Sequence, residues 1–455
     1  MELSTFVFLK SIWAFDFQNL VQRQMPRIEQ HFHVSDTEKF KSNLLDWGQD
    51  CDTVVWLDSN QHDEKYSQHN AIIALEQEQW IRCSYQDSFE KLKKFQAKIQ
   101  DYCFGFLGYD LKNDIESLSS QNHDGLEFPD LFFFQPKKLI FLSNGKATFK
   151  YLNSHSEEIK NDFESILNHK ETLFKKTKNN LTLNFRIQKE DYLKKVSSIL
   201  NHIHRGDIYE ANFCQEFYAE NEEIQPLEVY KKLNQISKTP FATYLKFEEN
   251  FLLSASPERY LKKNGCQIIS QPIKGTARRS SNKQKDLALK EALKNDPKER
   301  AENIMIVDLV RNDLSRIALK GSVQVEELCK VYSFKQVHQM ISSIVSEIPE
   351  NIHPVDIIKN SYPMGSMTGA PKVKAMKIIE KHEETKRSLY SGAVGYFTPE
   401  GNFDFNVIIR SILYNKKNKY VSCSVGSAIT SLSVPEKEFE ECLLKAKALR
   451  EVLLS

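Results

Sequence analysis

The order of its apolar segments constrains the fold of this chain most strongly. Short apolar runs typical of strands, among them 251–255, 266–270 and 405–413, are mixed with long helical segments such as 298–317 in no regular order. A parallel sheet needs strands and helices that alternate regularly along the chain. The mixed order therefore predicts an α+β protein whose sheet is mainly antiparallel.

No repeat and no long linker divides the 455 residues into separate domains. Residues 1–180 contain short strand-like runs and polar turns, and a Lys-rich stretch at 174–180 is the best candidate for a crossover on the surface. The helix and strand patterns are sharper in residues 181–455. We therefore expect an N-terminal part, 1–180, and a C-terminal part, 181–455, of one large fold.

Charge and cysteine usage exclude several classes of protein. The chain has 62 Lys+Arg against 61 Asp+Glu, a balance that gives no reason to expect nucleic acid or an anionic membrane as partner. The sequence contains no run of 18 apolar residues, so no membrane-spanning helix is predicted. The eight cysteines lack C-x-x-C spacing, and the start lacks the pattern of a signal peptide. We therefore expect reduced cysteines and a cytoplasmic location.

One lysine stands in a tight turn that follows an apolar strand. Lys274 lies between Pro272 and Gly275 in the segment Pro-Ile-Lys-Gly-Thr-Ala-Arg. If burial removes water from its amine, its pKa falls, and a neutral amine is a nucleophile or base at neutral pH. The alternative is a loop lysine that pairs with a carboxylate, and this segment alone does not decide between the two.

Two predicted helices each carry a pair of glutamates three residues apart. The pairs are Glu299 with Glu302, and Glu438 with Glu441. Residues at this spacing share one helical face, where like charges repel unless a cation lies between them. Two solvated acidic faces would explain the pattern equally well. If the faces converge, the four carboxylates predict a site for a hard cation, Mg²⁺ in particular.

Further polar groups stand at the ends of apolar runs. Glu258 follows the strand 251–255, where partial burial would raise its pKa and suit a general acid, although a salt bridge with Arg259 is the alternative. The loop 364–372, which contains Thr368 and Gly369, leads into a helix. Its N–H groups and hydroxyls suit a carboxylate or phosphate, or it is a plain helix-entry loop.

Two basic side chains interrupt apolar segments. Arg410 stands within the apolar strand 405–413 and needs an anionic partner there. His338 lies in an apolar stretch that we interpret as helical. A histidine with satisfied partners in the core and a substrate-binding histidine are both open at this position.

Taken together, these segments resemble the chorismate-utilising enzymes. The resemblance follows the family's order over roughly residues 190–450, through the segments 206–209, 256–259, 272–276, 300–303, 311–314, 365–372, 392–396 and 436–441. It implies a large single-domain fold in which two packed, mainly antiparallel sheets form a β-sandwich core with helices outside. The N-terminal 180 residues match loosely, chiefly through Trp-Leu-Asp-Ser at 56–59.

The position of Lys274 separates branches of this family. Anthranilate-forming members carry alanine at the third position of Pro-Ile-x-Gly-Thr, and aminodeoxychorismate-forming members carry the lysine found here. The resemblance therefore implies that chorismate and ammonia are converted to 4-amino-4-deoxychorismate, on the route to para-aminobenzoate and folate. Anthranilate formation and a non-catalytic, ligand-binding relative are the alternatives.

The resemblance also implies roles for individual residues. Lys274 would attack the substrate, Glu258 would protonate its departing hydroxyl, and Mg²⁺ would be held by Glu302 and Glu441, supported by Glu299 and Glu438. The substrate-binding residues that it implies are Arg410, Tyr396, Thr368, Gly369, His338, Gly426, Ser427 and Lys445.

The source of ammonia and two departures from the family pattern complete the expectations. No cysteine lies in a Gly-x-Cys-x-Gly elbow, so the resemblance implies a separate glutaminase subunit. Glu210 replaces the more common glutamine, and Ala428 stands in a Gly-rich stretch where it would restrict positive φ. Some members bind tryptophan near the positions of Ser59 and Pro240, and the sequence does not decide whether this chain does.

Overall fold

A computed structural model describes residues 27–454 except 63–64, 68, 170–180 and 335–336. The predicted boundary at residue 180 and the Lys-rich stretch 174–180 lie outside the described residues. Within the described part, every pairing between the named strands is antiparallel, and all strands join into one open sheet. The predicted α+β class with a mainly antiparallel sheet is confirmed.

The sheet has two halves that meet at its longest strands. One half runs in the order β7 (Asn184–Phe185), β8 (Glu210–Ala219), β20 (Tyr420–Ile429), β19 (Ser411–Asn415), β10 (Asn250–Ser256), β9 (Phe241–Phe247) and β2 (Thr53–Asp58). The other half runs in the order β4 (Cys103–Leu107), β17 (Ala393–Phe397), β18 (Phe403–Val407), β11 (Arg259–Asn264), β12 (Gln267–Gln271) and β15 (Val337–Glu347).

The paired strands β3 (Ala71–Cys83) and β5 (Leu131–Ser143) connect the two halves, because β2 pairs with β3 and β4 pairs with β5. Five shorter or peripheral strands complete the sheet: β1 (Arg27–His33), β6 (Lys146–Leu152), β13 (Ile273–Arg278), β14 (Gln324–Ser333) and β16 (Gly369–Ala370). Of these, β13 and β14 flank β15, and β16 lies against the start of β8.

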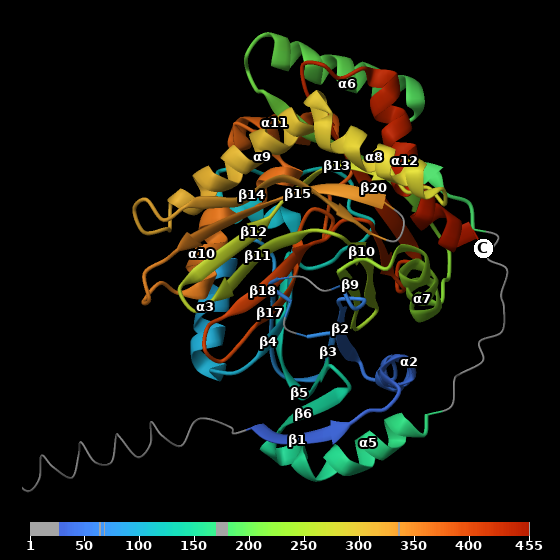
Figure 1. The fold of residues 1–455 in the computed structure, drawn as a ribbon, viewed down its shortest axis with the longest axis vertical. Coiled ribbons are helices and arrows are strands. Elements are labelled where there is room, and N and C mark those ends of the chain that lie inside the picture. The colour runs from blue at the N-terminus through green and yellow to red at the C-terminus, as the bar shows by residue number, and fades with distance from the viewer. Residues whose placement is uncertain (1–26, 63–64, 68, 170–180, 335–336, 455) are drawn as a thin grey trace, which may run out of the picture.

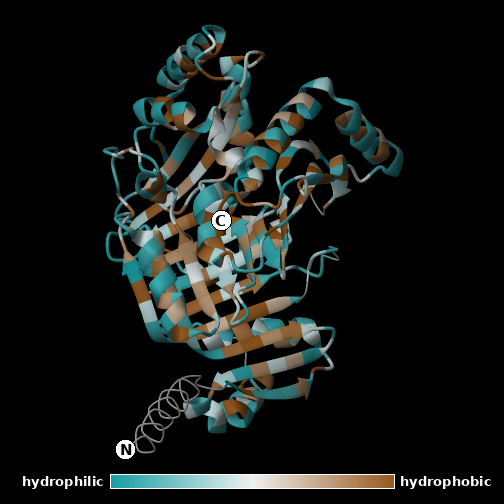
Figure 2. Cartoon of the chain, turned by 90° about the vertical axis from the view of Figure 1, so that its left-hand side faces the viewer, coloured by the Kyte–Doolittle hydropathy of each residue, from teal (hydrophilic) through white to brown (hydrophobic). Residues whose placement is uncertain are grey.

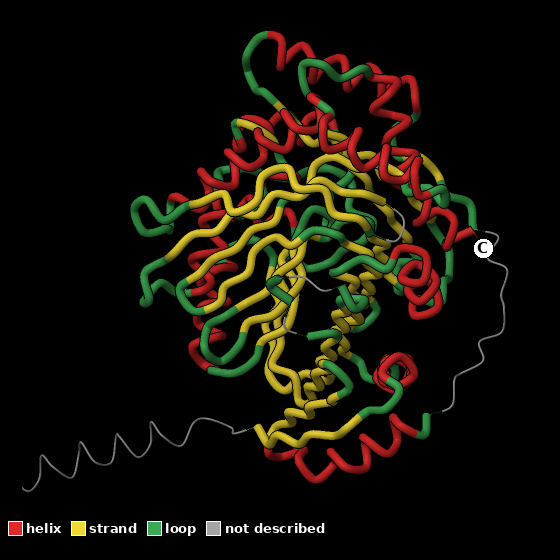
Figure 3. Tube along the Cα trace, viewed as in Figure 1, coloured by secondary structure: helices red, strands yellow, loops and turns green. Residues whose placement is uncertain are grey.

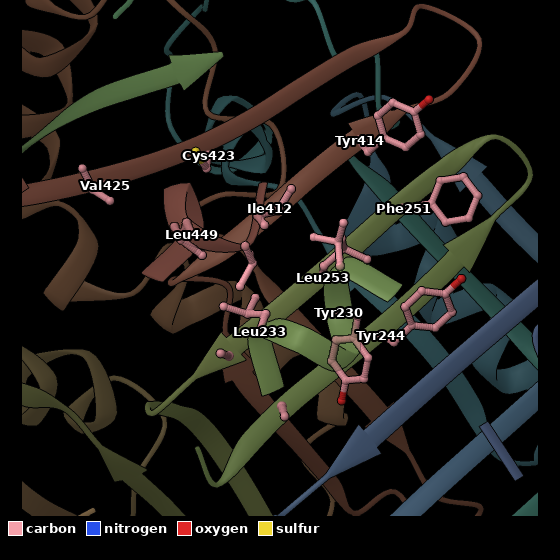
Figure 4. Packing of buried hydrophobic residues seen from close by; sticks show 14 of the residues in the cluster. Tyr230, Leu233, Tyr244, Phe251, Leu253, Ile412, Tyr414, Cys423, Val425 and Leu449 are labelled. Carbon is pink, nitrogen blue, oxygen red and sulfur yellow. The ribbon is translucent and has the colours of Figure 1, made fainter. Parts of the chain in front are cut away.

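Alternate residues of the first half enter two different cores, as the twofold period of a strand requires. On β10, Phe251 and Leu253 point into the cluster shown in Figure 4, together with Tyr244, Ile412 and Tyr414. Leu252 points into the other cluster, which it shares with Leu261 and Phe405 of the second half. The predicted two packed layers are therefore two halves of one sheet.

Helices cover the outside of these layers (Figures 1 and 3). Figure 2 shows apolar and polar residues mixed along these helices, and the buried ones, such as Tyr192, Val196 and Ile199 of α6, recur at helical spacing. The helices are α2 (Thr37–Gly48), α3 (Ser88–Ile99), α4 (Lys112–Ile115), α5 (Ile159–Leu167), α6 (Lys189–His204), α7 (Pro226–Ser237), α8 (Lys283–Asn295), α9 (Pro297–Ser315), α10 (Pro354–Ser361), α11 (Lys372–His382) and α12 (Pro435–Leu454).

Two helices carry the predicted glutamate pairs to the same region. α9 packs on β13 and β15, and α12 packs on β20. The start of α9 is fixed by Pro297 in the first turn and by the side chain of Asp296, which accepts hydrogen bonds from the N–H groups of Lys298 and Glu299. This cap fixes the first turn of α9, which carries Glu299.

Two local predictions are wrong. The stretch around His338 belongs to strand β15 and not to a helix, because its apolar residues are buried on both faces of the sheet. The predicted strand 405–413 is two strands, β18 and β19, separated by Arg410 with a φ of +52°. No helix of the described residues is long and apolar enough to span a membrane.

Candidate active site

Lys274 lies at the centre of a group of buried carboxylates. Its Nζ donates a hydrogen bond to Oε1 of Glu210 at 3.0 Å, and its side chain is 12% exposed. Burial alone would lower the pKa of this amine, but the carboxylates of Glu210 and Glu302 outweigh burial and raise the pKa above its usual value. The resting side chain is therefore an ammonium ion paired with a carboxylate, which is the alternative that the segment 272–278 left open.

Glu210, at the first position of β8, is the partner that the sequence did not reveal. It is buried, and its second oxygen, Oε2, has no hydrogen-bond partner among the described residues. A carboxylate that takes one hydrogen bond from an ammonium and keeps a free oxygen can also take its proton. Glu210 is 64 residues away from Lys274, so only the tertiary fold brings them together.

The backbone around Lys274 is held from α9. Gly275 has a φ of +94°, and a Cβ there would lie 3.1 Å from Oε2 of Glu299. The Asn303 side chain donates hydrogen bonds to the carbonyls of Lys274, at 3.3 Å, and of Met340, at 3.2 Å. Gly275 thus lets the carboxylate helix approach closely, and Asn303 fixes strand β13 at the lysine. The tight turn predicted around Lys274 is wrong, because residues 273–278 pair with β15 as a strand with a shift in register.

Glu258 is a buried acid beside Lys274. Burial raises its pKa to about 7, against the hydrogen bond from Ser366 and the charge of Lys274, which both lower it. The Ser366 hydroxyl donates to Oε1 of Glu258 at 2.7 Å. The alternative of a salt bridge with Arg259 is wrong, because Arg259 is paired with Asp404 at 3.0 Å. A carboxyl with this pKa is protonated often enough at neutral pH to act as a general acid.

The predicted glutamate pairs converge, although unequally. Glu302 lies close enough to Lys274 and Glu299 to interact with both charges, and burial raises its pKa to about 7. Lys298 bridges the two helices, with its Nζ 3.7 Å from Glu302 and 3.8 Å from Glu438. Burial would raise the pKa of Glu441, but Lys445 at 2.6 Å outweighs this and lowers it.

These residues fit a cation between α9 and α12. Oε1 of Glu302 is buried and has no hydrogen-bond partner among the residues that the structure describes, and an ammonium already stands between the helices at Lys298. Glu438 is less available, because it accepts a hydrogen bond from Ser427. Within the described residues no three acidic, His or Cys side chains form a metal site by themselves. A Mg²⁺ on Glu302 and Glu441 would therefore need oxygen ligands from water and from a substrate carboxylate.

A cationic group stands across this region. Arg410, between β18 and β19, is held in the left-handed conformation and interacts electrostatically with Tyr390 and Glu441. No carboxylate of the described residues forms an ion pair with its guanidinium. Burial lowers the pKa of Arg410, which an arginine tolerates without losing its charge. The group suits an anion supplied from outside, such as a carboxylate.

Gly426 and Tyr390 shape the wall beside Arg410. A Cβ at Gly426 would lie 2.1 Å from Oδ1 of Asn212 and 3.2 Å from the hydroxyl of Tyr390. Lys445 donates to the Gly426 carbonyl at 2.8 Å. The whole stretch is extended β20, so Ala428 needs no positive φ and the restriction expected from it is wrong.

Three predicted substrate-binding residues lie in other surroundings. The Thr368 hydroxyl donates to the loop carbonyls of Met364 and Gly365, at 3.3 and 3.2 Å, so its partners are in the protein. Gly369 allows β16 to approach the Glu210 carbonyl, which a Cβ would meet at 2.1 Å. His338 is buried and contacts Ser333 at 2.9 Å and Asp286 at 3.1 Å. It is a core histidine with satisfied partners.

Tyr396 is also separated from Arg410. It stacks on Phe104, with ring centroids 5.0 Å apart, and lines a different pocket with Ser59 and Pro240. Tyr390, six residues earlier in the chain, is the tyrosine that interacts with Arg410, the role that the sequence analysis gave to Tyr396. The pocket measures about 70 Å³, well below the ~300 Å³ of usual ligand sites.

The arrangement has the parts of a site for a dicarboxylate. It brings together the Lys274 ammonium, a buried carboxyl with a pKa of about 7, two helices that turn carboxylates to one region, and an arginine that has no ion pair within the described part of the chain. A family model described as chorismate binding enzyme matches residues 35–451, which is most of the chain. The chain belongs to the chorismate binding enzyme family.

The names of curated relatives in this family state two different activities. The chain is 34% identical over 368 residues to aminodeoxychorismate synthase component 1 of Escherichia coli (strain K12), covering 78% of this chain and 77% of the relative. It is 33% identical over 369 residues to anthranilate synthase component 1 of Acetivibrio thermocellus, covering 77% and 74%. Overall identity therefore does not separate the two activities.

Solved structures share the fold. The crystal structure of anthranilate synthase component I from Streptococcus pneumoniae TIGR4 superposes with a TM-score of 0.73 at 25% identity, over 87% of this chain and 95% of that one. The menaquinone-specific isochorismate synthase of Escherichia coli gives a TM-score of 0.74 at 17% identity, over 97% and 98%. The predicted single large fold of the family is confirmed.

Proposed function

We propose that this chorismate binding enzyme is an aminodeoxychorismate synthase component 1, which makes 4-amino-4-deoxychorismate from chorismate and ammonia for para-aminobenzoate and folate synthesis. The observation that carries the proposal is the buried Lys274 amine, 3.0 Å from Glu210 and beside Glu258, whose pKa is about 7. An enzyme that adds ammonia directly to the ring has no use for a second amine there. The proposal thus favours this reaction over anthranilate formation.

The chemistry begins with a proton transfer, because a charged Lys274 cannot attack. Glu210 is the group in contact with the ammonium and the one with a free oxygen, so it takes the proton. The neutral amine then forms a bond to C2 of chorismate. Both ring double bonds shift, from C1–C2 and C5–C6 to C1–C6 and C4–C5, the C4–O bond breaks, and Glu258 gives its proton to the departing hydroxyl, which leaves as water.

The second half reverses the shift. Ammonia forms a bond to C4, and both ring double bonds return to their original positions. The C2–N bond to Lys274 breaks with its electron pair on the lysine nitrogen. The new ammonium loses a proton to the Glu258 carboxylate, which restores the acid. Two allylic displacements replace one direct displacement of hydroxide, which is the advantage of a covalent intermediate.

Binding of the substrate divides between two ends of the site. Arg410 and Tyr390 would hold the pyruvyl carboxylate. Glu302 and Glu441 would hold Mg²⁺, with Glu299 and Glu438 in support, and the bound ion would bind the ring carboxylate and polarise the ring as a Lewis acid. The ring would then lie between Lys274 and Glu258.

Partner and location belong to the same proposal. No cysteine of the sequence lies in a glutaminase elbow, and relatives are named component 1, which supports a separate glutaminase subunit as the source of ammonia. All eight cysteines are free thiols, which supports a reducing compartment, the cytoplasm. The isolated chain should therefore use ammonium and not glutamine.

Product analysis tests the proposal directly. The purified chain is incubated with chorismate, Mg²⁺ and ammonium at alkaline pH, and the product is identified by mass and by conversion to para-aminobenzoate with an added lyase. Aminodeoxychorismate supports the proposal. Anthranilate as the product would replace it with the alternative activity, and turnover with glutamine alone would refute the need for a glutaminase partner.

A further inference from the structure

A small buried cavity lies directly behind Glu258. It measures about 20 Å³, and it separates the Glu258–Ser366 pair from the inner face of α9. Every residue that lines it is buried: Glu258, Arg259, Tyr260, Leu261, Ser270, Pro272, Val310, Asp313, Leu314, Ser361, Met364, Gly365 and Ser366. None of the proposed chemistry so far uses this space.

The size of the cavity restricts what it can hold. Roughly 10–15 Å³ of such space is enough for one water molecule. The cavity therefore accommodates one molecule of about that size, and chorismate or any part of its ring is excluded. Ammonia has nearly the same size as water.

The lining has the chemistry of a site for a small hydrogen-bond donor. Asp313 is 3% exposed, and its Oδ2 accepts a hydrogen bond from Lys372 at 2.6 Å. Its Oδ1 is buried and has no hydrogen-bond partner among the described residues. Val310, Leu314 and Met364 form apolar walls. Because an orphaned carboxylate oxygen is costly, a bound N–H or O–H donor would stabilise it.

The position of the cavity matches the needs of the reaction. This step rests on the proposed function, in which Glu258 protonates the hydroxyl at C4 and ammonia then attacks the same carbon. Ammonia must therefore arrive within contact distance of Glu258. The cavity is lined by Glu258 and by Val310, Asp313 and Leu314 of α9, so a molecule in it lies against Glu258.

We propose that this cavity is the binding site from which ammonia enters the reaction, with Asp313 Oδ1 accepting one of its N–H groups. Ammonia keeps its lone pair for the bond to C4, and its surplus proton passes to the Glu258 carboxylate as the lysine leaves. Val310 sets the size limit, and Asp313 is a binding residue for the second substrate.

Filling the cavity tests this proposal. Val310→Leu adds one methylene to the wall, enough to occupy the cavity, and we expect the KM for ammonium to rise about tenfold or more. The KM for chorismate should stay within about twofold, because the chorismate side of Glu258 is untouched. Val307→Leu makes the same change on the buried face of α9 one turn earlier, outside the lining, and should leave both values near those of the unchanged protein.

Enlarging the cavity gives a second, independent readout. Val310→Ala should let methylamine replace ammonia as nucleophile, detected as an N-methylated product by mass, whereas the unchanged protein should make little of it. This variant removes atoms and keeps the test possible if the leucine variant folds poorly. Thermal melts of each variant separate a binding effect from loss of the fold.

The outcomes distinguish a failure of the proposed function from a failure of the ammonia site alone. If the unchanged protein makes no aminodeoxychorismate, the proposed function fails and this inference fails with it. If it makes the product but Val310→Leu leaves the KM for ammonium unchanged, the inference alone is overturned. A variant that lowers kcat with no change in that KM assigns the cavity to water in a proton relay and also overturns the ammonia site.

Discussion

At the scale of single residues, the reaction needs Lys274 as a neutral amine and Glu258 as a protonated acid. Lys274 must lose a proton to attack, yet the neighbouring carboxylates raise its pKa. Glu258 must keep a proton to act as an acid, and its pKa is about 7. The form of the site that can react, with neutral Lys274 and protonated Glu258, is therefore a minor one. The rate of lysine attack depends on how its population changes with pH.

We predict the pH profile of adduct formation on Lys274 in the absence of ammonia. Below pH about 7, Glu258 is protonated and the Lys274 proton passes to Glu210 within the site, so the rate should be nearly independent of pH. Above that pH, Glu258 loses the proton that the leaving hydroxyl needs, and the rate should fall about tenfold per pH unit. Rapid-quench mass spectrometry at a series of pH values measures this.

The same experiment on Glu258→Gln provides the control. The variant should lose about 10²–10⁴ of the rate, as expected for a missing general acid, and the break near neutral pH should disappear. A break that stays in place in the variant would show that another group controls the profile.

Some residues of the site could not be predicted from their neighbours in the sequence. Glu258 follows the end of β10, and Lys274 stands between Pro272 and Gly275, so the local sequence pattern was informative for both. Glu210 becomes the partner of Lys274 only when β8 and β13 are brought together by the fold. Tyr396 and Tyr390 share one short segment, and strand pairing turns Tyr396 toward Phe104 instead of Arg410.

At the scale of elements, α9 and α12 were the most predictable part of the site. The i,i+3 glutamates share a helix face whatever the surroundings, so each pair could be predicted from spacing. Their unequal roles could not, because Ser427 and Lys445 reach Glu438 and Glu441 from outside the pattern. His338 was assigned to a helix because an apolar run has no clear period when both faces of a strand are buried.

We expect Glu302→Gln to lower ammonium-dependent activity about a hundredfold, because an amide is a poorer ligand for Mg²⁺ than a carboxylate. The protein without metal should lose no stability, since burial, the largest influence on Glu302, already disfavours its charged form. Glu440→Gln, an exposed position on α12, is the matched control and should keep full activity. Steady-state kinetics and thermal melts measure both effects.

Chelation completes this test. Excess chelator should abolish product formation in the unchanged protein, and added Mg²⁺ should restore it. Activity in chelator equal to that with Mg²⁺ would contradict a metal on Glu302 and Glu441.

At the scale of the whole molecule, the N-terminal part belongs to the same sheet as the site. β2 pairs with β9, and β4 pairs with β17, so residues before 180 supply neighbours to strands that carry or support the site. Removing them would expose the backbone groups of β9 and β17 and the apolar faces of both cores.

We therefore predict that residues 181–455 alone do not form a stable fold. The fragment should show no cooperative thermal transition by circular dichroism and should bind a dye for exposed apolar surface, whereas the full chain should melt in one transition. A fragment that melts cooperatively within a few degrees of the full chain would contradict the single shared sheet.

The central claim of this account is that Lys274 bonds to the substrate. The most direct measurement is the mass of the protein after incubation with chorismate and Mg²⁺ but no ammonia, followed by peptide mapping. Lys263 is an internal control, because burial lowers the pKa of its amine and makes it the more reactive lysine on chemistry alone. The account predicts a mass increase on the peptide that contains Lys274, none on Lys263, and none anywhere in Lys274→Ala. An unmodified Lys274 in a protein that makes aminodeoxychorismate, or full activity in the alanine variant, would contradict it.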